Sequence, residues 1–184
     1  PGYITDWGAH FVDVAQWGAG MDDTTPVEVS ATEVKRRDKG LYDAPEQFRL
    51  EYRYSNGVKM TMFSTTDKAT YGTRFIGSKG WIFTEAEQLK ASSMDILRIK
   101  MKEGDTRLYV SKHHHRNFID AVLERGQTAA PAEIAQRAAI ICHMGAIAAK
   151  IGQPLKFDPK TERFEGNEAA NAMITRPMRG PWTI

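Results

Sequence analysis

The order of apolar and polar positions predicts a helix first and then a series of strands. In residues 6–17 the apolar side chains recur at helical spacing, which predicts a helix with one buried face. The Gly-Ala-Gly segment at 18–20 supplies a C-terminal stop for this helix, and residues 22–26 have the composition of a turn. We therefore expect the chain to reverse direction before the first strand.

In the middle of the chain the pattern changes to strict alternation. Residues 27–34 and 48–54 alternate between apolar and polar positions, which predicts two strands. Asn56 and Gly57 precede a third alternating run and indicate a hairpin, because both residue types accept the positive φ angles of a type I′ turn. Further strands are predicted at 71–76, 80–84 and 94–101, so we expect one antiparallel sheet of about five to seven strands.

Helical spacing returns in the last third of the chain. Residues 113–123 carry one apolar stripe, and residues 132–151 predict a second helix whose many small side chains favour close packing against a neighbour. Residues 157–160 are turn-like, and residues 167–174 could form a short helix. We expect a single domain over residues 1–184, in which 153–184 is an extended tail that wraps the surface.

Composition and charge narrow the class of protein. The 184 residues are 41% hydrophobic and suffice for one substantial core. Twenty-five Lys and Arg face 23 Asp and Glu with the signs interspersed, so no nucleic-acid or membrane partner is expected.

Other sequence features concern the compartment of the protein. The single cysteine, Cys142, lies in an apolar helical run, and we expect a small buried hydrophobe rather than a disulfide partner. No stretch approaches the length that spans a bilayer, and residues 1–4 do not resemble a signal peptide. We expect a cytoplasmic protein, and because the chain begins inside a motif, an export signal could precede it in a longer sequence.

The first predicted helix carries the strongest candidate chemistry. Asp6 and His10 stand four residues apart, which on a helix places both side chains on one face, within reach of a common substrate atom. A histidine with a carboxylate nearby can take a proton from a hydroxyl near neutral pH, as the oxidation of an alcohol requires. Two structural interpretations stay open: His10 as an ordinary hydrogen-bonded histidine, and Asp6 as the N-cap or first-turn acid of the helix.

Three consecutive histidines, His113, His114 and His115, form a second candidate. Adjacent residues do not point at one ion, and no second cluster of ligands accompanies them, so we expect no metal site. The simplest interpretation is the polar start of a helix. Alternatively, His114 or His115 reaches a substrate pocket, because a helix N-terminus gathers donors for anionic or hydroxylated ligands.

The motif D-x-x-x-H-x-x-D-x-x-x-W, followed by an antiparallel sheet and more helices, resembles the C-terminal domain of the glucose-fructose oxidoreductase and inositol dehydrogenase family (Gfo/Idh/MocA). Further segments are similar to bacterial members, at residues 76–80, 114–120, 156–164 and 176–179. The expected fold class is accordingly α+β: an open, mainly antiparallel β-sheet with helices packed on one face.

The resemblance implies a substrate-binding and oligomerisation domain of an NAD(P)-dependent oxidoreductase that acts on a sugar, cyclitol or polyol. His10 matches the family's catalytic histidine, which removes the hydroxyl proton, and Asp6 matches the acid that orients the substrate or tunes His10. Asp13 matches a position that supports the helix. His114 and His115 fall in the family's helix opening and are the expected substrate-binding residues.

The resemblance also sets expectations for cofactor and partners. The segment at 18–20 lacks the third glycine and the following helix of a dinucleotide fingerprint, and the family's E-K-P stretch is absent, so this chain alone is not expected to bind NAD or NADP tightly or to turn over. A homo-oligomer is expected through the open sheet face, because Met60 and Met62 alternate with Val58 and Phe63. Two alternatives stay open: an NAD-dependent glycoside hydrolase of the same family, and a non-catalytic dimerisation or carbohydrate-binding module.

Overall fold

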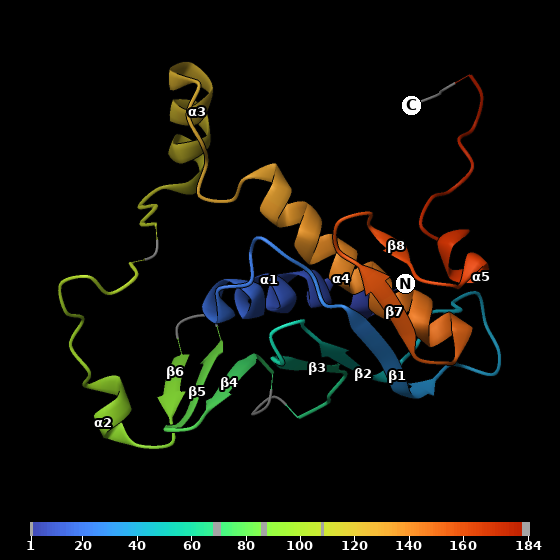
Figure 1. The fold of residues 1–184 in the computed structure, drawn as a ribbon, viewed down its shortest axis with the longest axis horizontal. Coiled ribbons are helices and arrows are strands. Elements are labelled where there is room, and N and C mark those ends of the chain that lie inside the picture. Colours follow the sequence, from blue (N-terminus) through green and yellow to red (C-terminus); the bar gives the residue numbers. More distant parts are fainter. Residues whose placement is uncertain (1, 68–70, 86–87, 108, 182–184) are drawn as a thin grey trace. The chain divides into compact units, whose positions relative to one another are not determined.

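The computed structural model describes residues 2–67, 71–85, 88–107 and 109–181 (Figure 1). The chain divides into two compact units, of which the first contains Pro1–Tyr71 with Arg137–Ile184 and the second contains Gly72–Gln136. Each unit has its own antiparallel sheet with helices beside it. The α+β class with open antiparallel sheets is therefore confirmed.

The first unit combines the beginning and the end of the chain. Its elements are η1 (Gly2–Ile4), α1 (Trp7–Ala19), β1 (Glu28–Lys35), β2 (Gln47–Arg53), β3 (Lys59–Phe63), most of α4 (Ala132–Ile151), β7 (Leu155–Asp158), β8 (Arg163–Phe164) and α5 (Glu168–Asn171). The five strands form one sheet in the order β3-β2-β1-β7-β8. The predicted helices at 6–17 and 132–151 are both confirmed.

The strands β7 and β8 differ from the predicted tail. Residues 157–160 were expected to form a turn, whereas Phe157 is a buried residue of β7 and pairs with Phe164 of β8. Leu155, also buried, pairs with Val29 of β1. Four residues show too little alternation to identify a strand, and the partner strand lies more than a hundred residues earlier in the sequence.

One face of the five-stranded sheet is covered by α1 and α4 (Figure 1). The core joins Val12 of α1, Leu50 of β2 and Ile141 of α4, each at most 2% exposed. By length and composition α4 could also cross a membrane, contrary to the expectation that no stretch approaches that length. Nine of its residues are buried in the folded chain, which gives α4 the position of a core helix.

The predicted hairpin between β2 and β3 is confirmed, but its turn differs from the expected type. Gly57 has φ of 88°, whereas Asn56 keeps a negative φ. The Gly57 N–H donates to the carbonyl oxygen of Tyr54 over 3.0 Å, and the Tyr54 N–H donates to the carbonyl of Val58 over 2.9 Å. This is the pattern of a type I turn closed by a glycine bulge. The backbone of Asn56 stays outside the left-handed region, and its side-chain oxygen accepts a hydrogen bond from the Val58 N–H.

The second unit contains β4 (Thr73–Gly77), β5 (Gly80–Glu85), β6 (Gln88–Ala91), α2 (Met94–Leu97) and α3 (His114–Glu124), and its strands follow the order β4-β5-β6. The predicted strand at 94–101 is wrong, since α2 begins there and β6 precedes it. The apolar residues at 94, 97 and 101 share a helical face, whereas 94 with 96 and 99 with 101 alternate in opposite phase, so neither period holds over the whole segment. The predicted single sheet is thus two sheets.

The second face of the five-stranded sheet carries charged side chains beside an apolar one. Met60 and Met62 are half-buried and pack on the core side. Val58 lies outside β3, and Phe63 remains as an apolar side chain of the open face, where the guanidinium of Arg49 lies 5.6 Å from its ring centroid. Both faces of the sheet therefore carry apolar side chains, as expected, although on the open face Phe63 has charged neighbours.

Candidate functional site

The candidate site lies on the solvent side of α1. Three residues at intervals of four form its buried face: Gly8, Val12 and Gln16. At 100° per residue, spacings of four, three and four place a different set on one common face: Asp6, His10, Asp13 and Trp17. The helix thus presents two acids and a histidine outward because its small and apolar positions face the sheet.

Gln16 fixes this helix to the loop that follows it. Its side-chain amide donates to the carbonyl oxygens of Met21 and Thr24, both over 3.0 Å, and accepts from the hydroxyl of Tyr54. Gly20 ends the helix in the left-handed conformation, with φ of 65°. A buried polar residue with these bonds determines where α1 lies on the sheet.

Asp6 occupies the N-cap position of α1 but makes no side-chain capping hydrogen bond. Its backbone supports the helix start instead: the Asp6 N–H donates to Gly2 over 3.2 Å, and its carbonyl accepts from the Ala9 N–H over 3.1 Å. The carboxylate is exposed. Asp6 thus takes the N-cap position, but its carboxylate does not cap the helix and is accessible to a ligand.

His10 is exposed, and its ring centroid lies 5.6 Å from that of Trp7. Among the residues that the structure describes, none donates a hydrogen bond to the His10 imidazole or accepts one from it. The interpretation of His10 as an ordinary hydrogen-bonded histidine therefore does not agree with the structure. The exposed imidazole is accessible to a ligand.

Asp13 lies beside His10 and is half-buried. Burial raises the pKa of Asp13, while the charge of His10 opposes that rise. Burial and the charges of Asp13 and Asp23 also raise the pKa of Asp22. Arg137 Nη1 donates to the Asp22 carbonyl over 2.9 Å, which ties this acidic loop to α4. Asp13 lies close enough to this loop to repel Asp22, and the supporting role expected for Asp13 stays a prediction.

An aromatic cluster, formed by Trp7, Phe11 and Tyr71, adjoins the Asp6 and His10 pair. The Trp7 ring centroid lies 6.3 Å from that of Phe11 and 5.6 Å from that of Tyr71. Phe11 and Tyr71 meet edge to face at 4.9 Å. Helical spacing did not identify Trp7 or Tyr71 as part of the site, because it assigns residues to a face of one helix and cannot bring residue 71 to that face.

The three consecutive histidines begin α3 in the second unit. His113 is the N-cap, and its Nδ1 accepts from the Arg116 N–H over 3.1 Å, so one nitrogen is used by the helix itself. His114 and His115 are exposed, with ring centroids 6.0 Å apart. In the described ranges, no three His, Cys, Asp or Glu side chains form a set that could hold a metal. The structure brings Asp6 and His10 together on one helix, whereas His114 and His115 belong to the other unit.

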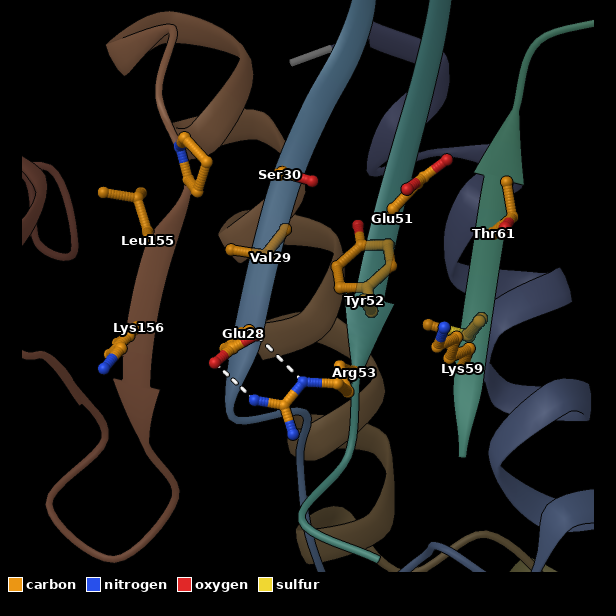
Figure 2. Close-up of a pocket in the computed structure, with 12 residues that line it drawn as sticks. Glu28, Val29, Ser30, Glu51, Tyr52, Arg53, Lys59, Thr61, Leu155 and Lys156 are labelled. Carbon is orange, nitrogen blue, oxygen red and sulfur yellow. Dashed lines mark hydrogen bonds and ion pairs between the residues drawn. The ribbon is translucent and has the colours of Figure 1, made fainter. Parts of the chain in front are cut away.

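A shallow groove crosses the open face of the five-stranded sheet, and Figure 2 looks onto it with the helices behind the strands. The Glu28 carboxylate pairs with Arg53 on the neighbouring strand, which lowers the pKa of Glu28. Neither Asp6 nor His10 lines this groove. It is a charged surface on the sheet, separate from the candidate chemistry on α1.

The fold and the site together define a class of protein domain. In this class of α+β domain, an open antiparallel sheet packs against a helix that carries an exposed acid and an exposed histidine. Comparison of the sequence with protein families identifies the family: residues 1–184 match the model described as oxidoreductase family, C-terminal alpha/beta domain. The chain belongs to this family, as the resemblance predicted. No curated protein sequence matches it significantly.

Solved structures share the fold at low sequence identity. The WlbA dehydrogenase from Bordetella pertussis, in complex with NADH and UDP-GlcNAcA, has a TM-score of 0.57 and 13% identity over 85% of this chain and 45% of its own. An NAD-binding protein from Listeria innocua has a TM-score of 0.55 and 14% identity over 84% and 51%. GenD2 from gentamicin A biosynthesis, in complex with NAD, has 0.53 and 16% over 85% and 48%. This chain thus spans about half the length of these relatives.

Proposed function

We propose that this chain is the substrate-binding and oligomerisation domain of an NAD(P)-dependent oxidoreductase acting on a sugar, cyclitol or polyol. The observation that carries the proposal is the exposed Asp6 and His10 pair on α1, in which the carboxylate does not cap the helix. Membership of the oxidoreductase family supports it. So do the relatives that hold NADH with UDP-GlcNAcA, or NAD.

In this proposal the side chains of His10 and Asp6 have different roles. His10 accepts the proton of the substrate hydroxyl at a ring nitrogen, because a neutral imidazole has one nitrogen that can accept a proton. Asp6, one turn earlier, accepts a hydrogen bond from the substrate or stabilises the imidazolium that forms. The nicotinamide cofactor supplies the hydride acceptor when it is bound to the full-length protein.

Among the described residues, α1 and the glycine segment at 18–20 do not fit the pyrophosphate of a dinucleotide. Phosphate binds at a helix N-terminus behind a glycine-rich turn. In the Gly-Ala-Gly segment at 18–20, Gly20 ends α1 instead of preceding a helix. The N-terminus of α1 carries the Asp6 carboxylate, whose negative charge repels a phosphate group. We therefore assign cofactor binding to sequence outside this chain.

Two further assignments belong to the proposal. His114 and His115 are exposed in the first turn of α3, where imidazoles can donate to substrate hydroxyls. The open sheet face, with Phe63 among its charged neighbours, pairs with a second copy of the chain. Its complementary charges, such as Glu28 and Arg53, fit a self-complementary twofold contact.

The test replaces His10 by Ala in the full-length protein and measures NADH formation from a panel of free sugars, cyclitols and polyols. We expect kcat to fall by about 10²–10⁴-fold, the usual contribution of a general base. The matched control is His143→Ala, because His143 is an exposed histidine of α4 outside the site.

Three outcomes separate the candidate functions. Loss of turnover in His10→Ala alone supports the oxidoreductase. Unchanged turnover in a correctly folded His10→Ala protein contradicts it and favours a non-catalytic module. Sugar release from a glycoside without net NADH formation identifies the glycoside hydrolase instead.

A further inference from the structure

We propose that Trp7, supported by Phe11 and Tyr71, is a stacking platform for the apolar C–H face of a ring-shaped polyhydroxylated substrate. This inference rests on the proposed function, because it deepens the site formed by Asp6 and His10. It assigns Trp7 to ring recognition and leaves proton transfer to His10.

Trp7 is held in place although much of it is in contact with solvent. Trp7 is 48% exposed although its indole contacts three other rings. Phe11 lies beside the indole at an interplanar angle of 23°, and Tyr71 meets it at 68°. Because Phe11 and Tyr71 also contact each other at 88°, the cluster restrains the indole before any ligand arrives.

The position of the indole relative to His10 suits a ligand that touches both. The two ring centroids lie 5.6 Å apart, and the planes are inclined at 51°. At this separation one six-membered ring that stacks on the indole can also place a hydroxyl against the imidazole. Asp6, adjacent to Trp7 in the sequence, adds an exposed carboxylate that can accept from a second hydroxyl.

The chemistry of the cluster favours a saturated hydroxylated ring. The face of an indole is electron-rich, so it attracts ring C–H groups that carry a partial positive charge. A site for such a ligand combines aromatic walls with a few polar groups that fix its orientation. Trp7 supplies the wall, and Asp6 and His10 supply the polar groups, all within one turn of α1.

Trp17 provides a matched control on the same helix. It is 46% exposed, nearly the same as Trp7, and it lies on the face that carries His10. In the part of the chain that the structure describes, Trp17 makes no ring contact. If exposed tryptophan on α1 were enough, the two residues would behave alike.

The experiment uses the full-length protein with Trp7→Leu, Trp7→Phe, Trp17→Leu and His10→Ala. The probes are myo-inositol, D-glucose and UDP-GlcNAcA as ring substrates and D-sorbitol as an open-chain polyol. Binding is measured by titration calorimetry, and KM and kcat are measured where a probe turns over. We expect Trp7→Leu to weaken ring binding and raise KM by about tenfold, with kcat within about threefold of wild type.

The controls make each result decisive. Trp7→Phe keeps an aromatic face, so we expect a smaller rise in KM and a wild-type circular dichroism spectrum even where Trp7→Leu unfolds. Trp17→Leu should raise the KM for ring probes much less than Trp7→Leu does, and only Trp7→Leu should reduce the preference for rings over D-sorbitol.

Two patterns overturn the platform. One is that Trp7→Leu and Trp7→Phe both bind ring probes like wild type, and the other is that the wild-type protein binds none of them. If His10→Ala abolishes turnover while the Trp7 variants are unaffected, the platform is wrong and the proposed function stands. If His10→Ala turns over normally, the proposed function itself fails.

Discussion

Three buried groups in the core hold their protons more tightly than they would in water. Burial raises the pKa of the Cys142 thiol to about 12, and it also raises the pKa of the hydroxyls of Tyr52 and Tyr54. Cys142 is 1% exposed, so the expectation of a small buried hydrophobe is confirmed. The thiolate and phenolate forms are excluded from the core because they cannot be solvated there.

These groups predict a loss of stability at alkaline pH. Their folded pKa values lie above the unfolded values, so only the unfolded chain releases their protons between pH 9 and 12, and stability falls as pH rises through that window. Urea midpoints at pH 7, 9 and 11 measure the effect. Cys142→Ala should flatten the decline above pH 9, and equal wild-type midpoints at pH 7 and 11 would contradict the prediction.

At the scale of elements, the packing of α4 on β2 depends on a glycine. A Cβ atom at Gly145 would overlap the hydroxyl of Tyr52 and approach Leu50 Cδ1 to 2.5 Å. The many small residues of the predicted helix at 132–151 indicated a close approach, and here that approach is to the sheet. A strand and a helix can come this near only where one of them lacks a side chain.

Gly145→Ala is therefore expected to destabilise the fold by about 1–3 kcal/mol through overpacking, even though Ala is favoured in a helix by about 1 kcal/mol. Chemical denaturation measures the difference. Gly18→Ala is the matched control, because Gly18 is an exposed helical glycine of α1, and it should be neutral or stabilising by up to about 1 kcal/mol. Equal effects of the two substitutions would mean that α4 does not pack closely at Gly145.

Local patterns in the sequence predicted the individual helices and strands better than they predicted which distant strands pair. Five elements have a run of apolar and polar positions long enough to identify their period, and they lie where the sequence predicted them: α1, α4, β1, β2 and β3. The segment at 94–101 keeps neither period throughout, and its first four residues form α2. The strand β7 is short, and it exists because β1 offers a free edge to pair with.

At the scale of the whole molecule, the open face of the five-stranded sheet is the surface on which the proposed oligomer depends. Its charges are paired along the sheet, Glu28 with Arg53 and Arg49 with Glu51. Phe63 is 46% exposed beneath the Arg49 guanidinium. An aromatic side chain next to arginine is the composition of an interface anchor.

Phe63→Glu is expected to weaken self-association of the full-length protein by about 30-fold or more, because it places a charge at that anchor. Light scattering coupled to size-exclusion chromatography over a concentration series measures the mass. Leu41→Glu is the control, since Leu41 is fully exposed in the loop between β1 and β2. A wild-type monomer, or an unchanged mass in Phe63→Glu, would show that this face is not the contact.

The sequence by itself determined the α+β class, the family, the two main helices and the spacing that places Asp6 and His10 on one face. These properties depend on local periodicity and on residues a few positions apart, which the order of side chains fixes directly. Only the tertiary structure decided that the strands form two sheets, that the end of the chain completes the first of them, and that Tyr71 joins Trp7 beside His10. Those arrangements depend on which distant segments bury each other's surfaces, and no local pattern encodes that choice.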